Sequence, residues 1–283
     1  MSKAITGINI IKEYGGRKVL DGIDLDIDRG EIFGLLGPSG AGKTTLIRIL
    51  TGQIVQDGGT ACINGKNSSR LTGEDRRRFG IAMDDFGIYD RLSCFDNLKL
   101  FARLYGIGNA EISAVLRKVG LSDAAKTPAG RLSKGMTGRL KLARAFMTDP
   151  DVLFLDEPTN GLDPVSANEV HKIILAEKER GKTVFLTTHT MTEAEKLCGS
   201  IALLNEGKIV ERGSPKDICR RYDHQRMLKI HLTDGSDIEL PYSTDSAARL
   251  SEFIGKGLAE TIHTSEPDLE TVFMELTGKE LSA

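Results

Sequence analysis

The sequence of 283 residues has no tryptophan, few other aromatic residues and only four cysteines, and its charges almost cancel. The cysteines stand at Cys62, Cys94, Cys198 and Cys219 without a C-x-x-C pair, so neither a disulfide framework nor a zinc site is expected. A formal net charge of −2 lacks the basic excess that nucleic-acid-binding proteins carry. No apolar run approaches the roughly 18 residues of a membrane span, and residues 1–11 contain no signal-peptide core. These absences favour a cytosolic chain with reduced thiols, unless a partner holds it at a membrane.

The composition itself is typical of soluble globular proteins, with 40% hydrophobic and 28% charged residues. A chain of this length predicts one large domain or two smaller ones, with enough residues for a sizeable core. Strand-like apolar runs and helical patterns both occur along the chain, which indicates an α/β fold.

A phosphate-binding pattern follows an early apolar run. The pattern G-x-x-x-x-G-K-[ST] is matched by Gly37, Pro38, Ser39, Gly40, Ala41, Gly42, Lys43, Thr44 and Thr45. Glycines let the backbone curl so that N–H groups point at phosphate oxygens, and the helix that follows adds its positive dipole end. Lys43 would reach the β- and γ-phosphates, and the Thr44 hydroxyl would ligate Mg²⁺. Because an apolar strand pattern leads in and a helical pattern leads out, we expect a nucleotide phosphate site rather than a plain turn.

Two carboxylates follow a second apolar run. Val152–Leu155 is typical of a strand buried on both faces, and it ends in Asp156 and Glu157. In α/β sheets the chemistry gathers beyond the carboxyl ends of the strands. In a chain with a phosphate loop, Asp156 would hold Mg²⁺ through its water shell, and Glu157 would orient or deprotonate the attacking water.

Three further positions have two interpretations each. His189 follows the buried strand pattern Thr183–Thr187; a lone histidine is usually structural, but at this edge it would also be able to donate to a γ-phosphate. Ser133 precedes a helical pattern, where it would either cap the helix or bind an anion together with the Gly135 backbone. Tyr14 lies in a turn between two strand patterns, where its ring would stack on an adenine or cap the sheet core.

In this order the motifs resemble those of the ATP-binding subunit of an ATP-binding cassette (ABC) transporter, over roughly residues 3–220. GPSGAGKTT is similar to the family's Walker A motif, LSKGM to its signature, VLFLDEP to Walker B and NGLD to its D-loop. His189 stands at the switch-histidine position and Tyr14 at the position of the adenine-stacking aromatic residue. The resemblance implies a P-loop NTPase core with a mixed sheet, an antiparallel β-subdomain and an inserted α-helical subdomain at about residues 86–147. It also implies that the chain binds ATP and Mg²⁺ and hydrolyses ATP.

The resemblance further implies that one chain holds only half of each site. In the family two cassettes pack head to tail, and ATP lies between the phosphate loop of one and the signature of the other. Ser133 and Gly135 would therefore meet the nucleotide held by Lys43 of a second chain, either an identical copy or a sister cassette. ATP then joins the two chains and hydrolysis releases them.

Two stretches depart from the family pattern. The common signature ends in Gly-Gly-Gln, where this chain has Lys134, Gly135 and Met136, a form that resembles the subgroup exporting drugs, antibiotics or peptides. Asp84 stands where the family has the glutamine of its Q-loop; it would still ligate Mg²⁺, but it adds a negative charge beside Asp156. We expect an altered Mg²⁺ dependence, which an Asp84→Gln variant with unchanged Mg²⁺ titration and turnover would contradict.

The central part of the chain is expected to be helical. From Cys94 to Gly106 the residues Phe95, Leu98, Phe101, Ala102 and Tyr105 recur at helical spacing. We expect this stripe to belong to the core rather than to a docking face. The segment 86–95 is the candidate for meeting a membrane partner.

The chain is expected to form two domains, an ATPase domain at residues 1–221 and a small α/β accessory domain at residues 222–283. In the latter, Leu228–Leu232 and Ile238–Leu240 predict a hairpin, and a capping box at Ser265–Asp268 predicts the start of the last helix. We expect the accessory domain to support packing or dimerisation rather than to sense a ligand.

Two functions of different class are compatible with the resemblance. The first is the ATPase subunit of a membrane exporter, with a separate transmembrane permease that holds the chain at the cytoplasmic face of the cell membrane. The second is a soluble cassette protein with a regulatory or a nucleic-acid- or ribosome-associated role. Such relatives usually carry two cassettes, a long coiled coil or basic stretches, and the sequence shows none of these. We therefore expect the exporter subunit, and no nucleic-acid partner.

Overall fold

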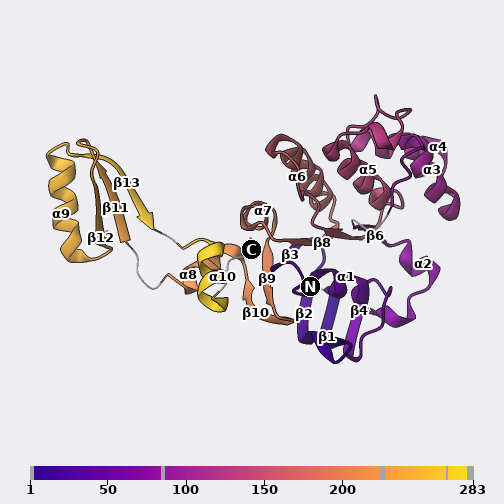
Figure 1. The fold of residues 1–283 in the computed structure, drawn as a ribbon, viewed down its shortest axis with the longest axis horizontal. Coiled ribbons are helices and arrows are strands. Elements are labelled where there is room, and N and C mark those ends of the chain that lie inside the picture. The colour runs from indigo at the N-terminus through magenta and orange to yellow at the C-terminus, as the bar shows by residue number, and fades with distance from the viewer. Residues whose placement is uncertain (1–2, 84–86, 224–226, 266, 279–283) are drawn as a thin grey trace. The chain divides into compact units, whose positions relative to one another are not determined.

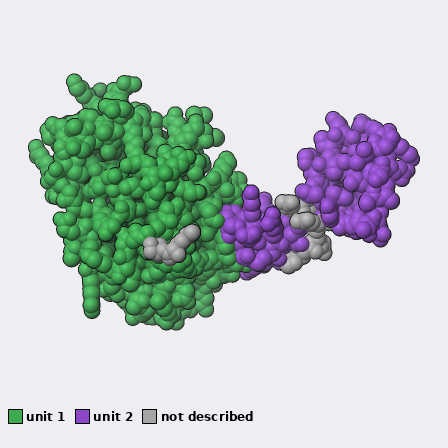
Figure 2. Space-filling view, turned by 180° about the vertical axis from the view of Figure 1, so that it is seen from behind, with its two compact units in different colours: residues 1–213, 281–283 green, residues 214–280 purple. Residues whose placement is uncertain are grey.

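The structure is a computed structural model that describes residues 3–83, 87–223, 227–265 and 267–278. The chain divides into two compact units between Gly213 and Ser214 (Figure 2). The domain boundary predicted after residue 221 lies beyond helix α8 (Pro215–Arg221), which falls in the second unit because it contacts α10 (Leu269–Thr277) there. None of the described helices is long and apolar enough to cross a membrane.

A six-stranded sheet of order β10-β9-β3-β8-β7-β6 forms the centre of the first unit (Figure 1). Its strands are β3 (Ile32–Leu36), β6 (Phe79–Ala82), β7 (Val152–Asp156), β8 (Thr183–Thr188), β9 (Ser200–Asn205) and β10 (Lys208–Gly213). All neighbours run parallel except β9 and β10. Every residue of β3 and β8 is buried, as continuous apolar runs predict for strands covered on both faces. The ring of Phe185 lies 5.5 Å from that of Phe33 and 5.7 Å from that of Phe154, which joins three neighbouring strands.

The other sheet of this unit is antiparallel and has the order β2-β1-β4-β5. Its strands are β1 (Lys3–Tyr14), β2 (Arg17–Asp28), β4 (Gly58–Ile63) and β5 (Lys66–Asn67). Helix α1 (Lys43–Leu50) contacts both sheets and buries Leu46, Ile47, Ile49 and Leu50 in a core shared with them. The start of α1 is therefore held firmly beyond the end of β3.

Three helices are inserted between β6 and β7: α3 (Cys94–Tyr105), α4 (Asn109–Lys118) and α5 (Lys134–Phe146). They pack on one another, as the central helical patterns predict. The expectation that the aromatic stripe of α3 is core was wrong in part. Leu98 and Ala102 are buried, whereas Phe101 and Tyr105 line a cavity of about 280 Å³ between α3, α5 and β6.

The remaining helices of the first unit are α2 (Gly73–Arg76), α6 (Pro164–Glu179) and α7 (Met191–Leu197), with 3₁₀ turns at Ser68–Arg70 and Ala129–Arg131. Asp163 caps α6 by accepting hydrogen bonds from the backbone N–H groups of Val165 and Ser166, with Pro164 as the first helical residue. Aspartate is a preferred N-cap residue and proline is favoured at the first helical position, so the local sequence specifies this helix start.

The second unit contains a three-stranded antiparallel sheet of order β12-β11-β13. Its further elements are β11 (Met227–Leu232), β12 (Asp237–Pro241), α9 (Thr244–Gly255) and β13 (Ala259–Ser265). The predicted hairpin is confirmed as β11 and β12. The predicted capping box at Ser265 is wrong, because Ser265 pairs with Met227 at the end of β13 and the side chain of Asp268 caps α10 instead.

Candidate active site

The loop between β3 and α1 has a backbone that only glycine tolerates at two points. Gly42 caps α1 with φ of 112°, and a Cβ atom there would lie 2.8 Å from the carbonyl oxygen of Val19. A Cβ atom at Gly37 would collide with the carbonyl oxygen of Leu204. A Cβ atom at Gly40 would meet open space, but its φ of 79° lies in the left-handed region that also favours glycine. No side chain caps α1, so the N–H groups of its first turn are free to bind an anion at this loop.

The ammonium group of Lys43 lies between the loop and a carboxylate. Its Nζ atom donates to the carbonyl oxygens of Gly37 at 2.6 Å and Pro38 at 3.2 Å, and it lies 3.2 Å from Oε1 of Glu157. Lys43 is only 5% exposed, and a buried cation needs such partners. The side chain is thus fixed at the mouth of the loop, where it would meet a phosphate.

A hydroxyl and a carboxylate meet beside this lysine. Thr44 donates from Oγ1 to Oδ2 of Asp156 at 2.7 Å, and Thr187 donates to the other carboxylate oxygen. The pairing of β7 with β8 places Asp156 opposite Thr187. Thr187 was not predicted as a site residue, although the pair Thr187 and Thr188 directly after the apolar run of β8 was the available signal.

These oxygen donors fit Mg²⁺. The ion usually takes one or two protein ligands and completes its shell with phosphates and water. Thr44 and Asp156 supply a hydroxyl and a carboxylate, and within the described residues no cluster of three or more His, Cys, Asp or Glu side chains offers an all-protein site. Asp84, the other predicted ligand, lies outside the described residues.

Glu157 occupies a strained turn directly after β7. Its φ is 48°, a conformation that costs a non-glycine residue energy, and its N–H is shared between the carbonyl and hydroxyl oxygens of Thr187, each at 3.1 Å. Its Oε2 atom lies 2.9 Å from Nδ1 of His189. Since that carboxylate oxygen accepts, Nδ1 carries the proton of this bond. The site therefore brings together Lys43, Asp156, Glu157 and His189, which the sequence singled out separately.

Tyr14 lies beside the tight turn, Gly15 and Gly16, that connects β1 to β2. Its side chain is half exposed, and Nζ of Lys12 lies 5.2 Å from the ring centroid. A ring this exposed is not part of the buried core, which favours the stacking interpretation, and adenine stacking stays the prediction for Tyr14. Tyr14 pairs with Arg17 at the start of β2. Two residues further along β2, the carbonyl group of Val19 packs against the phosphate loop at Gly42. The ring thus stands at the end of the hairpin whose second strand lines the loop.

Ser133 and Gly135 stand apart from this group. Ser133 is exposed and caps α5 by accepting a hydrogen bond from the N–H of Met136 at 3.2 Å. Gly135 is buried, where a Cβ atom would lie 2.7 Å from Oγ of Ser166. Among the residues that the structure describes, no hydrogen bond or ion pair joins either of them to the lysine or the carboxylates.

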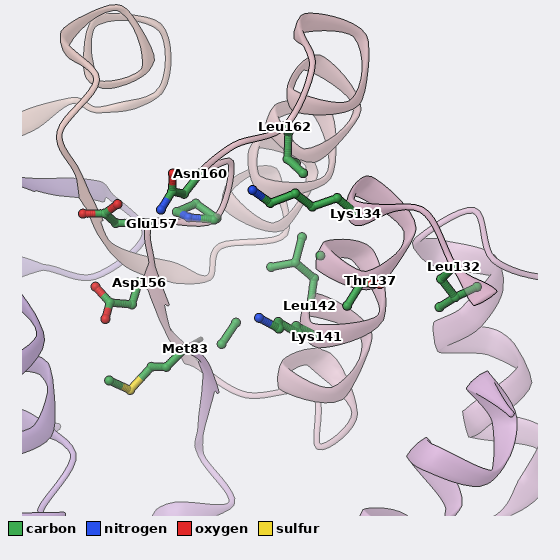
Figure 3. Close-up of a pocket in the computed structure, with 13 residues that line it drawn as sticks. Met83, Leu132, Lys134, Thr137, Lys141, Leu142, Asp156, Glu157, Asn160 and Leu162 are labelled. Carbon is green, nitrogen blue, oxygen red and sulfur yellow. The ribbon is translucent and has the colours of Figure 1, made fainter. Parts of the chain in front are cut away.

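A cavity of about 200 Å³ lies between α5 and the carboxylates (Figure 3). Asp156, Glu157 and Asn160 line one side, and Lys134 and Lys141 reach in from α5 on the other. Lys134, the first residue of α5, thus faces the carboxylates across this cavity, whereas the capping residue Ser133 is exposed.

Comparison with known proteins places this chain in a family. The family model described as ABC transporter matches residues 20–160. The chain is 40% identical to a fluoroquinolones export ATP-binding protein of Mycobacterium tuberculosis, over 98% of this chain and 94% of that protein. It is 32% identical to a linearmycin resistance ATP-binding protein of Bacillus subtilis, over 96% of this chain and 98% of that protein. A solved structure of an ATP-binding subunit of an ABC transporter superposes with a TM-score of 0.70 and 29% identity, over 77% of this chain and 93% of that one.

Proposed function

The chain belongs to the ABC transporter family as an ATP-binding subunit, and from this premise we propose that it hydrolyses ATP to drive a membrane exporter of drugs, antibiotics or peptides. The relatives that match nearly the whole chain are named for export of, or resistance to, such compounds. The observation that carries the site assignment is the convergence of Lys43, Thr44, Asp156, Glu157 and His189 through direct contacts. The alternative of a soluble, non-transport cassette protein has no comparable support.

In this proposal each residue of the site has one role. Glu157 accepts the proton of the attacking water as general base. Nδ1 of His189 bonds to Glu157, which leaves Nε2 for a γ-phosphate oxygen. Lys43 and the loop N–H groups bind the β- and γ-phosphates. Mg²⁺, held by Thr44 and Asp156, would neutralise charge on the transferred phosphate.

A second chain completes the site in this proposal. Ser133 is exposed at the start of α5, and the serine hydroxyl and the Gly135 backbone would bind the nucleotide held by another cassette. One phosphate loop and one signature per chain require such a head-to-tail pair. The pair is either a homodimer or a dimer with a sister cassette.

A separate permease is the other expected partner, and it would hold the chain at the cytoplasmic face of the cell membrane. We assign the cavity of about 280 Å³ between α3, α5 and β6 to a segment of that permease. None of the described residues of the predicted segment 86–95 lines this cavity, but the carbonyl of Gly87 accepts a hydrogen bond from the cavity residue Arg144, so that segment stays a prediction for the same partner. Phe79, Phe101 and Tyr105 give it an apolar lining, and Arg76 and Arg144 stand among its lining residues. Such a surface suits a short amphipathic helix.

The Glu157→Gln variant tests the proposal. The amide keeps the shape of the side chain but is not a base, so turnover should fall by roughly 10²–10⁴-fold while ATP still binds. ATP binding without hydrolysis should then trap the pair of chains, which size-exclusion chromatography with and without ATP would detect. A variant that hydrolyses ATP at the normal rate would refute the role of Glu157.

A further inference from the structure

Glu193 on α7 is a nearly fully buried carboxylate that the roles above do not use. It is 3% exposed, and its Oε1 atom accepts a hydrogen bond from Oγ1 of Thr159 at 2.7 Å. The same oxygen lies 3.1 Å from Nε2 of His171 on α6. These three polar side chains come from the segment after β7, from α6 and from α7, and they meet close in the chain to Glu157 and His189.

The hydrogen bond between Thr159 and Glu193 closes a ring of contacts that includes Glu157 and His189. Thr159 follows Glu157 by two residues, and Glu193 follows His189 by four. At the other side of the ring, Glu157 and His189 contact each other at 2.9 Å. Two short chain segments, residues 157–159 and 189–193, are thus tied together at both ends.

Internal bonds stiffen the histidine segment of this ring. The N–H of Thr190 donates to Oγ1 of Thr188 at 3.0 Å, and the N–H of Glu193 donates to the carbonyl of Thr190 at 3.2 Å. The glutamate segment has little freedom either, because it contains a proline and because the N–H of Glu157 is bonded to Thr187. A displacement at one tie is therefore transmitted to the other.

Stability alone does not account for this carboxylate. Its Oε2 atom is buried and has no hydrogen-bond partner among the described residues. Burying an incompletely paired carboxylate costs free energy, so an apolar side chain of similar volume would suit the folded state at least as well. What only an acceptor supplies here are the bond to the Thr159 hydroxyl and the contact with Nε2 of His171.

We propose that Glu193 is a positioning residue for the ATPase reaction. Through Thr159 it holds the strained turn that carries Glu157, and through α7 it holds His189, so that base and histidine keep their contact. His171 extends the tie to α6, on the far side of the 160–163 turn. This inference rests on the proposed role of Glu157 as general base.

The test compares Thr159→Val with Thr159→Ser. Valine keeps the shape of threonine but removes the donor, and displacements of about 1 Å in a catalytic group cost up to roughly 10²-fold in rate. We expect kcat of Thr159→Val to fall 10- to 100-fold, with the ATP dissociation constant within twofold of the wild type. Thr159→Ser restores the hydroxyl and should return kcat to within threefold. Glu193→Met should behave as Thr159→Val does.

Glu177→Met is the matched control. Glu177 on α6 is also buried, at 1% exposure, but it pairs with Lys118 and Arg180 and has no bond to the ring. Its replacement should lower the melting temperature and leave kcat of the folded protein unchanged. If Thr159→Val has wild-type kcat, or if it only lowers stability as Glu177→Met does, the inference is overturned.

A double-mutant cycle separates this inference from the proposed function. If the ring acts through the base, Thr159→Val adds no further loss to the residual turnover of Glu157→Gln. A multiplicative loss in the double variant would overturn the inference. Normal turnover in Glu157→Gln alone would refute the proposed function itself, whatever Thr159→Val shows.

Discussion

Replacing Lys43 by methionine tests the phosphate site most directly. Methionine fills the buried slot with an unbranched side chain of similar length, but it has no charge and no hydrogen-bond donor. The substitution removes the contacts of Nζ with the carbonyl oxygens of Gly37 and Pro38 and with Oε1 of Glu157. Loop geometry should survive, because the glycine positions fix it independently.

The expected loss of ATP affinity is large, whereas the loss of stability is moderate. A hydrogen bond to a charged group is worth about 1.5–3 kcal/mol, so losing one or two phosphate contacts should raise the dissociation constant at least roughly tenfold to 100-fold. Breaking a fully buried ion pair costs about 3–5 kcal/mol. The side chain of Glu157 is 20% exposed and keeps His189 as a partner, so about 1–2 kcal/mol of folding stability is expected here.

Isothermal titration calorimetry with ATP and thermal unfolding separate these two effects. Lys182→Met is the matched control: Nζ of Lys182 also contacts a backbone carbonyl and a carboxylate, both of Asp149 and both at 3.1 Å, and its side chain is 12% exposed. This lysine precedes β8 at the end of the strand opposite to Thr188 and His189. The control should lose stability but keep its ATP affinity. Unchanged affinity in Lys43→Met, or an equal loss in both variants, would refute the phosphate-cradle assignment.

Further outcomes are expected at three positions. Tyr14→Ala should weaken ATP binding by about 1–3 kcal/mol if the ring stacks on adenine. Because the chain has no tryptophan, Tyr14→Trp introduces a single tryptophan whose emission should change with ATP, and unchanged emission would contradict stacking. Ser133→Ala should abolish the ATP-dependent pairing of chains in a Glu157→Gln background, measured by size exclusion, while one chain still binds ATP. The hydrogen bond with Asp237 raises the pKa of His231, so this pair stabilises the second unit at low pH and the contribution is lost as pH rises through that pKa. An NMR titration should show a midpoint above the ordinary value of about 6.5, returning toward it in Asp237→Asn.

The phosphate loop and the carboxylates were predictable because each depends on a short local pattern. Gly37–Thr45 specifies its own turn, and Val152–Glu157 specifies a buried strand with two carboxylates at its end. The contacts between them were not predictable from spacing alone. Lys43 and Glu157 lie far apart in the chain, and only the order of strands β3, β8 and β7 brings them together.

Other features could not be predicted from the sequence because tertiary contacts determine them. Serine and aspartate are both good N-cap residues, so either Ser265 or Asp268 could start the last helix. Because Ser265 pairs with β11, the helix begins after Asp268. The stripe on α3 has the spacing of core residues, but the space beside Phe101 and Tyr105 is left open by β6 and α5. Periodicity identifies the apolar face of a helix and not what covers that face.

The separation of Ser133 from Lys43 within one chain has a consequence for genetics. In the proposed head-to-tail pair, a Lys43 defect damages one nucleotide site through the chain that carries the phosphate loop, and a Ser133 defect damages the opposite site. When a Lys43→Met chain pairs with a Ser133→Ala chain, both defects fall on the same nucleotide site and the other site is built from two intact halves. Two alleles that are each inactive alone would therefore complement one another when expressed together, and two alleles altered in the same motif would not.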